Sequence, residues 1–345
     1  MLNVMGIKHI AKAMNKTLFF SIITLYLASC QNLKKADKEI FCQVESQIEA
    51  YPDSSFFSDI SCMLHDGKQI YVLDKKRGDI VSLSDDLKTM EYVSHHGEAP
   101  YETTWPFTFN VLNDTVYAVD FGTKSMKKFH QGTFCGSFPL SNANENRFSL
   151  NDSSIFLSAT TDSTSFLIID RHHPEKQIPK GRVVQENTPF KTIISNKKHI
   201  LYDEGKGIFS VSDCYPYIDQ YTIDGKHIKT FDISSVPVIN EAMKEASKLS
   251  ANEKSVYTYI HDAYLANDCI YTLCSSRDSH NDYKINTILK FSIHNDMKLA
   301  ATYILPHDIY SSFCVSREYI FASQKVSGTT IEKIKKQETG LRKRK

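Results

Sequence analysis

One short apolar pattern recurs six times along this chain of 345 residues, and it constrains the fold more than any single motif does. The copies occupy residues 70–74, 116–120, 155–159, 208–212, 270–274 and 319–323, so successive copies begin 46, 39, 53, 62 and 49 residues apart. A period of this size indicates a repeated supersecondary unit, because unrelated strands do not recur at a regular spacing.

Polar turns divide each repeat into short strands. In the fourth repeat, Asp224 and Gly225 join strands expected at 217–223 and 227–233, and an Asp-Gly pair between two such runs is a strong hairpin signal. Four antiparallel strands at a period of roughly 40 to 50 residues form the blade of a β-propeller. The sequence therefore predicts an all-β, six-bladed β-propeller with four-stranded antiparallel blades over residues 40–337.

Two irregularities in the repeat have their own explanations. The widest gap contains residues 240–249, which predict one short inserted helix with Asn240 as its N-cap. The sixth repeat is short, since only the strand at 329–334 follows its apolar copy. We expect the strand at 40–44 to supply the missing strand and join the two ends, because an open ring exposes strand edges.

The first 29 residues are typical of a lipoprotein signal peptide. Lys16 precedes an apolar run at 18–27, which is too short for a permanent membrane-spanning helix. A translation start at Met14 leaves the same signal. Residues 27–30, Leu-Ala-Ser-Cys, resemble the bacterial lipobox, in which the chain is cut before the cysteine and the cysteine is acylated.

The lipobox resemblance implies a cellular location for the protein. Cys30 is the expected lipidation site and residues 30–39 the lipidated tether, so the chain is expected to be exported and anchored to a membrane. Gln31 favours the outer membrane by the enterobacterial sorting rule, and the leaflet is not assigned. The alternative is a secreted protein with a coincidental cysteine. Residues 338–345 form a basic tail, interpreted as solvated.

Charge and cysteine usage exclude several classes of partner. The formal net charge is +1, so nucleic acid is not an expected partner. Seven cysteines follow Cys30, at positions 42, 62, 135, 214, 269, 274 and 314, and none has CxxC or zinc-ligand spacing. We therefore expect no metal site and no cofactor. The cysteines are interpreted as small buried hydrophobic residues, although an exported compartment also permits disulfides.

Residues 97–102 carry a resemblance to a known family. The segment Gly-Glu-Ala-Pro-Tyr-Glu lies between the first and second repeats, where six-bladed NHL-like or TolB-like propeller lipoproteins of Bacteroidetes have Gly-x-Gly-Pro-x-Glu. Ala99 stands where the family has its second glycine, and this departure puts the turn in that loop in doubt. The resemblance covers the mature chain, and it implies a fold and a location without implying a reaction.

No sequence motif of catalysis is present. The chain contains no Walker A loop, GxSxG elbow, HExxH motif or EF-hand loop, and no catalytic residue is assigned. We expect a binding or scaffolding module at the cell envelope, attached to the membrane by its lipid and partnered by a protein, peptide or glycan. The alternative is a glycan-active hydrolase or lyase that uses the propeller mouth.

Candidate binding residues come from loops, because propellers bind ligands at the mouth of the ring. An aromatic and charged rim suits a carbohydrate or a peptide, while the plainer interpretation is ordinary exposed loop residues, and Trp105 alternatively packs between blades. The candidates are Tyr101, Glu102, Trp105, Arg171, His172, Tyr215, Tyr217, Arg277 and Asp278.

Overall fold

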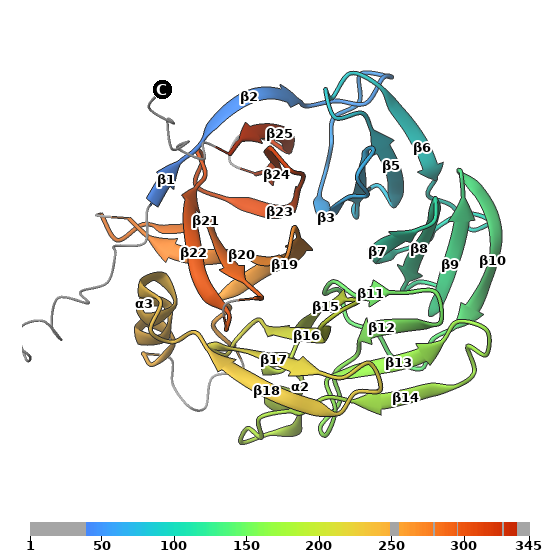
Figure 1. Ribbon diagram of the computed structural model, residues 1–345. Helices are drawn as coiled ribbons and strands as arrows, with labels where there is room; N and C mark the ends of the chain where they lie inside the picture. Colours follow the sequence, from blue (N-terminus) through green and yellow to red (C-terminus); the bar gives the residue numbers. More distant parts are fainter. Residues whose placement is uncertain (1–38, 249–254, 279, 295, 326–327, 337–345) are drawn as a thin grey trace, which may run out of the picture. The chain divides into compact units, whose positions relative to one another are not determined.

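The computed structural model describes residues 39–248, 255–278, 280–294, 296–325 and 328–336. In Figure 1, six small sheets surround a common axis like the blades of a propeller. Each sheet contains a run of four antiparallel strands, so the predicted six-bladed, all-β architecture is confirmed. Cys30, the tether over most of its length and the basic tail lie outside the described residues.

The first three blades follow the order of the chain, each running from the axis outwards. Their strands are β3 (Ile60–His65), β4 (Ile70–Asp74), β5 (Asp79–Leu83) and β6 (Met90–Ser94); β7 (Pro106–Leu112), β8 (Thr115–Asp120), β9 (Ser125–His130) and β10 (Thr133–Pro139); β11 (Ser149–Leu150), β12 (Ser154–Ser158), β13 (Phe166–Asp170) and β14 (Gln177–Lys180).

The last three blades complete the ring, in which the inner strand of each blade packs against those of its neighbours. Their strands are β15 (Lys198–Asp203), β16 (Gly207–Ser212), β17 (Tyr217–Tyr221) and β18 (His227–Asp232); β19 (Ile260–Ala266), β20 (Cys269–Arg277), β21 (Tyr283–Ser292) and β22 (Lys298–Ile304); β23 (Tyr310–Val315), β24 (Tyr319–Gln324) and β25 (Thr330–Lys335).

The N-terminal segment closes the ring. Strand β2 (Gln43–Ile48) is the fourth strand of blade six and pairs antiparallel with β25, with Val44 opposite Ile334. The expected closure by an N-terminal strand is therefore observed. The segment is longer than expected and bends, because β1 (Glu39–Phe41) pairs instead with the outer strand of blade five, in parallel.

Burial explains why the second strand of each blade carried the repeat signal. Every residue of β4 and β5 is buried, since these strands are covered on both faces by neighbouring blades. The outermost strand β2 alternates between exposed and half-buried positions. A strand covered on both faces is continuously apolar, whereas a half-exposed strand alternates.

The aspartates that end two of the repeats fix the connections between blades. Asp74 is fully buried and accepts hydrogen bonds from the backbone nitrogens of Ser58, at 2.8 Å, and Asp59, at 3.0 Å. Asp120 is also buried and accepts from the backbone nitrogens of Thr104 and Trp105. Each aspartate thus ties the chain entering a blade to the second strand of that blade.

The inserted helix starts earlier than predicted. Helix α3 spans Pro237–Ala246, with Val236 as N-cap and proline in the first turn, so Asn240 lies inside the helix and does not cap it. Proline at the start of a helix is favoured because its missing N–H has no intrahelical role there. The predicted end at residue 249 lies outside the described residues. A second helix, α2 (Pro189–Ser195), was not predicted; Thr188 caps it.

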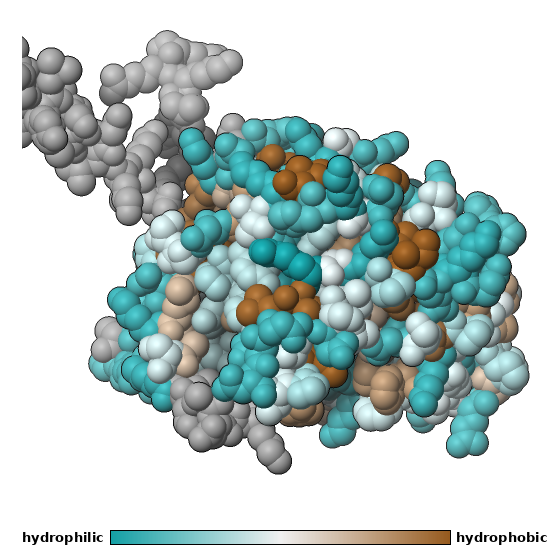
Figure 2. Space-filling model, turned by 90° about the horizontal axis from the view of Figure 1, so that it is seen from below, coloured by the Kyte–Doolittle hydropathy of each residue, from teal (hydrophilic) through white to brown (hydrophobic). Residues whose placement is uncertain are grey.

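All seven cysteines after Cys30 are free thiols, and all except Cys135 are buried. The interpretation as buried hydrophobic residues is confirmed for six of them. Among the described residues, no helix has the length and apolar character needed to span a membrane. The face in Figure 2 is mostly hydrophilic, with apolar side chains in separate small patches; exposed apolar residues on the outer strands include Ile178 and Ile228.

Candidate functional site

The ring has two different faces. On the loop face, where the inner strands begin, the chain enters each blade through connections such as residues 95–105 and 181–197. On the turn face, where the inner strands end, short turns such as Asp66 to Lys68 lead to the second strands. Long connections give a face more varied side chains, so the loop face is the better place to look for a site.

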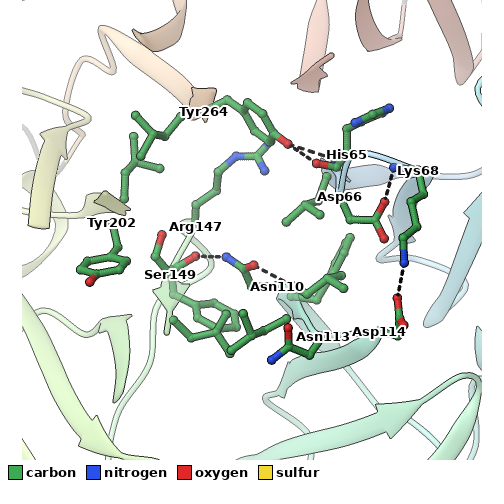
Figure 3. A pocket seen from close by; sticks show the side chains of 18 residues that line it. His65, Asp66, Lys68, Asn110, Asn113, Asp114, Arg147, Ser149, Tyr202 and Tyr264 are labelled. Carbon is green, nitrogen blue, oxygen red and sulfur yellow. Dashed lines mark hydrogen bonds and ion pairs between the residues drawn. The ribbon is translucent and has the colours of Figure 1, made fainter. Parts of the chain in front are cut away.

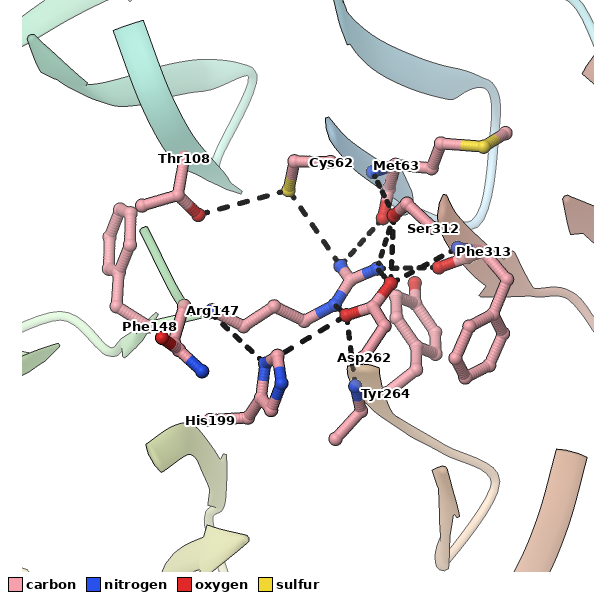
Figure 4. A network of polar contacts seen from close by, with 12 residues as sticks. Cys62, Met63, Thr108, Arg147, Phe148, His199, Asp262, Tyr264, Ser312 and Phe313 are labelled. Atoms are coloured by element: carbon pink, nitrogen blue, oxygen red, sulfur yellow. Dashed lines mark hydrogen bonds and ion pairs between the residues drawn. The ribbon is translucent and has the colours of Figure 1, made fainter. Parts of the chain in front are cut away.

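A buried ion pair fills the centre of the ring between the two faces (Figure 4). The Arg147 guanidinium binds both carboxylate oxygens of Asp262, with Nε to Oδ1 at 2.5 Å and Nη2 to Oδ2 at 2.6 Å. It also donates to the carbonyl oxygens of Met63, at 2.6 Å, and Phe313, at 2.5 Å. This one side chain from the connection before β11 therefore joins blades one, three, five and six.

The charge on Arg147 is stable despite its burial. Burial lowers the pKa of the guanidinium, but the nearby Asp262 carboxylate outweighs it and the net pKa is raised. A buried charge of this kind is tolerated only when it is paired and its donors are satisfied. The Arg147–Asp262 pair, here called the plug, is thus a charged pair buried on the axis of the ring.

The plug separates two cavities, and Arg147 lines both. The turn-face cavity, shown in Figure 3, has a volume of about 590 Å³. Its lining includes Leu64, His65, Asp66, Lys68, Asn110, Leu112, Asn113, Asp114, Leu150, Leu201, Tyr202, Tyr264 and Leu265. The loop-face cavity, here called the mouth cavity, has a volume of about 390 Å³. Its lining includes Asp59, Lys75, Phe107, Glu145, Asn146, Lys197, His199, Asp213, Cys214, His261, Asp262 and Lys325.

Ion pairs neutralise the charges at the rim of the mouth cavity. Glu145 lies between two lysines, 3.1 Å from Lys75 and 3.0 Å from Lys197. Burial would raise the pKa of Glu145, but the two ammonium groups outweigh it and lower that pKa. Lys325 pairs with Asp59 in the same way. The rim is therefore polar and largely charge-compensated.

The deepest polar groups of the mouth cavity are His199 and Asp213. His199 Nδ1 accepts a hydrogen bond from the Arg147 backbone nitrogen at 3.3 Å, which assigns the ring proton to Nε2. That Nε2 lies 3.4 Å from Asp213 Oδ1 but is buried without a hydrogen-bond partner. Asn146 Nδ2 donates to both Asp213 oxygens, at 2.9 and 2.8 Å.

Burial shifts the titration of this pair. It raises the pKa of Asp213 to about 7 and lowers the pKa of His199 to about 4. At neutral pH a neutral imidazole therefore faces a carboxyl group that is partly protonated. Each group can donate or accept a hydrogen bond or a proton, which is the chemistry expected of binding and acid–base residues. Burial also lowers the pKa of His261 to about 4.

Three aromatic side chains adjoin the mouth cavity and form what we call the aromatic platform: Trp105, Phe107 and Phe121. The rings of Phe107 and Phe121 are stacked at 4.6 Å, and Trp105 stands edge-on to both. Trp105 and Phe121 are 48% and 42% exposed. Phe107 lines the cavity, and Lys75 Nζ lies 4.6 Å from its ring centroid.

The predicted candidates in the first inter-blade connection have separate roles. Tyr101 is 62% exposed, and Trp105 belongs to the aromatic platform. Glu102 holds its own loop: Oε2 accepts from the Ala99 nitrogen at 2.9 Å, and a Cβ on Gly97 would lie 1.8 Å from that oxygen. A side chain at position 97 would therefore have to displace the Glu102 carboxylate from this loop. Ala99 is not among the residues with positive φ, so the turn tolerates alanine there.

The remaining predicted candidates are dispersed. Arg171 and His172 lie on the turn face between β13 and β14, where Arg171 Nη2 donates to the Tyr117 hydroxyl at 2.5 Å. Tyr215 and Tyr217 stack at 5.7 Å on the loop face. Arg277 and Asp278 lie beside α3 in another cavity of about 410 Å³.

None of the nine predicted candidates lines the mouth cavity. The residues that do, such as Arg147, His199 and Asp262, lie in or just before the inner strands. Their one sequence signal is a charged or imidazole group where an otherwise apolar inner strand begins. Among the described residues, no cluster of three or more His, Cys, Asp or Glu side chains is arranged to hold a metal ion.

Comparison with known proteins identifies the fold. No family model matches the chain, and no curated protein matches it. A solved exported protein of Bacteroides fragilis is similar over 88% of this chain and 97% of that one, with a TM-score of 0.56 and 10% identity. Virginiamycin B lyase from Staphylococcus aureus is similar over 84% and 98%, with a TM-score of 0.52 and 10% identity. A luciferin-regenerating enzyme is similar over 85% and 96%, with a TM-score of 0.54 and 6% identity.

Proposed function

We propose that this protein is a lipid-anchored binding module of the cell envelope, which takes a protein segment, peptide or glycan into the mouth cavity. The observation that carries the proposal is His199, whose Nε2–H is buried in the cavity wall without a hydrogen-bond partner. Buried polar groups in proteins are nearly always paired, and an unpaired one can bind a water, an ion or a ligand. The volume of about 390 Å³ falls within the usual range of small-ligand pockets, about 300–1,000 Å³.

The proposed location rests on the lipobox-like residues 27–30. The likeness to an exported protein, at 10% identity, supports the fold alone. In this proposal Cys30 is acylated and its lipid is held in the outer membrane. Residues 30–39 connect Cys30 to the propeller. We expect metabolic labelling with a palmitate analogue to label the wild-type protein and to fail for Cys30→Ala, which should leave the membrane fraction. A labelled, membrane-bound Cys30→Ala protein would refute the anchor.

The site is tested by blocking each cavity in turn. Glu145→Arg places a long side chain at the rim of the mouth cavity, and Asp114→Arg does the same at the turn-face cavity. The two substitutions are matched, because each replaces an acidic partner of a lysine at 3.1 and 3.3 Å respectively. In calorimetric screens of glycans and peptides, we expect Glu145→Arg to abolish ligand binding and Asp114→Arg to leave it unchanged. The reverse result would move the site to the turn face.

A second candidate function is a glycan-active hydrolase or lyase. The observation favouring it is the close pair of His199 and Asp213 with shifted pKa values in one cavity. The likeness to virginiamycin B lyase, at 10% identity, assigns no catalytic residue in this chain. Asp213→Asn distinguishes the two functions: an enzyme would lose turnover of a bound glycan while retaining binding, whereas a binding module shows no turnover in either form.

A further inference from the structure

We propose that the mouth cavity binds an uncharged carbohydrate, with a sugar ring against the aromatic platform and a hydroxyl group that contacts both His199 and Asp213. This inference rests on the proposed binding function and narrows the ligand from three chemical classes to one. Three independent features of the cavity lead to it: the platform, the paired charges of the rim and the unpartnered imidazole N–H.

The aromatic platform is partly exposed, and backbone hydrogen bonds join its two segments. The backbone nitrogen of Trp105 donates to Asp120 Oδ1 at 2.8 Å, and the Phe121 nitrogen donates to the Trp105 oxygen at 2.9 Å. These bonds fix the backbone that carries Trp105 and Phe121, and the three rings pack against one another. Exposed aromatic clusters mark interaction sites, and an exposed aromatic face matches the C–H face of a sugar ring.

The charged side chains of the cavity are already engaged with one another. Lys75 and Lys197 are both engaged by Glu145, and Lys325 is engaged by Asp59. Arg147 is satisfied by Asp262 and two carbonyl oxygens. An anionic ligand would compete with Glu145 for the two lysines, whereas an uncharged ligand with many hydroxyl groups leaves these pairs intact.

The pair at the back of the cavity fits a hydroxyl group. His199 Nε2 carries a proton and needs an acceptor, while the Asp213 carboxyl 3.4 Å away can accept a proton donor. One hydroxyl group can accept from the imidazole and donate to the carboxyl at the same time, because it has one O–H and two lone pairs. Phe107 and His199 line the same cavity, so ring and hydroxyl contacts are available to one oligosaccharide.

The experiment titrates the membrane-extracted protein by calorimetry with three probe sets: neutral gluco-, manno-, xylo- and chito-oligosaccharides, oligogalacturonates and a hexapeptide library. We expect the tightest ligand to be a neutral oligosaccharide. Trp105→Ala and Phe121→Ala should each weaken it by roughly tenfold or more, which corresponds to about 1.4 kcal/mol. The matched control is Phe190→Ala, because Phe190 is 58% exposed on α2, is part of the same face and does not line the cavity.

Each other outcome counts against a defined claim. If an oligogalacturonate or a peptide binds tightest and Glu145→Arg abolishes that binding, the carbohydrate inference fails and the proposed binding function stands. If no probe binds the wild-type protein, both fail. Two conservative variants guard against misfolding. Trp105→Phe should retain most of the affinity for the oligosaccharide. His199→Gln should weaken that affinity while its thermal midpoint stays the same as that of the wild-type protein. Wild-type affinity in Trp105→Ala, Phe121→Ala and His199→Gln would overturn the inference.

Discussion

Two cavities occupy opposite ends of one axis, yet their chemistry differs. The turn-face cavity of about 590 Å³ is the larger, and many of its walls are apolar ends of inner strands, including Leu64, Leu201 and Leu265. The mouth cavity of about 390 Å³ gathers two histidines and four acidic side chains from different blades. Volume is therefore a poor guide to function in this ring, and the kind of connection that borders each cavity is a better one.

Chain length at the two faces accounts for the difference. A turn of a few residues must satisfy its own backbone, as Asp66 does by accepting from the nitrogens of Lys68 and Gln69. The connection at residues 181–197 has room for helix α2 and for side chains that reach towards the axis, among them Ile194 and Lys197. Titratable groups therefore collect where the chain is long enough to present them.

Removing the plug between the cavities should have the largest effect. Arg147→Met leaves Asp262 buried without its partner, so we expect the free energy of unfolding to fall by about 3–5 kcal/mol in urea titrations. The double variant Arg147→Met with Asp262→Leu removes both charges and should recover most of that loss. A double variant no more stable than the single one would contradict the view that the plug acts as a charge pair.

The mouth cavity should also give stability a distinctive pH dependence. The pKa of Asp213 is about 7 in the folded protein, against 3.8 without burial, so the folded state holds this proton between those values. Its contribution to stability is complete below about pH 4 and is lost as pH rises through 7, by at most about 4 kcal/mol at 1.36 kcal/mol per pKa unit. Asp213→Asn should therefore be progressively more stable than wild type from pH 4 to pH 8.

The comparison with the turn face supplies the control for this measurement. Asp114→Asn at the rim of the turn-face cavity also removes one carboxylate, 48% exposed, and controls for the loss of a negative charge away from the mouth cavity. His199 contributes in the opposite direction, since its lowered pKa makes the folded state resist protonation as pH falls from 6.5 towards 4. Because His199 contacts Asp213, the double variant His199→Gln with Asp213→Asn, compared with His199→Gln alone, separates the two contributions. A flat profile for Asp213→Asn would show that Asp213 ionises normally.

The blades could be predicted from the sequence because a strand that is buried on both faces is mostly apolar and is easily recognised. The strand expected at 70–74 is β4, and the strand at 79–83 is β5, with every residue buried. The closing strand was also predictable, since a short last repeat needs a partner. The start of α3 was wrong because Asn240 was preferred as a cap over the proline at residue 237.

The mouth cavity could not be predicted in the same way. Its key residues, Arg147, His199, Asp213 and Asp262, come from three blades, and only the closed ring brings them together. Arg147 lies outside any strand, before the two-residue β11, so no strand pattern points it to the axis. Trp105 was named as a candidate from the sequence, but its partner Phe121 could be found only once Asp120 had tied the two connections together.

Loosening a loop-face connection should have an intermediate effect. Asp74→Asn weakens hydrogen bonds from the nitrogens of Ser58 and Asp59 and from the Tyr51 hydroxyl to a fully buried carboxylate. We expect a loss of about 1–3 kcal/mol in unfolding free energy and faster amide exchange in residues 51–59. Asp66→Asn in a turn-face turn is the control and should lose less, because water can replace its bonds. Equal losses would remove the distinction between the two faces.

The smallest effect is expected from the exposed ion pairs, and it tests whether the two rims differ electrostatically. Lys68 and Asp114 pair at the turn face with side chains 76% and 48% exposed, so a double-mutant cycle with alanine should give a coupling of at most about 0.5 kcal/mol. Lys75 and Glu145 pair at the mouth with side chains 24% and 47% exposed. Because Lys75 is more buried and Glu145 has a second lysine partner, we expect a larger coupling, up to about 1 kcal/mol, and one that high salt screens less. Equal couplings with equal salt dependence would mean that the charged rim of the mouth is ordinary protein surface.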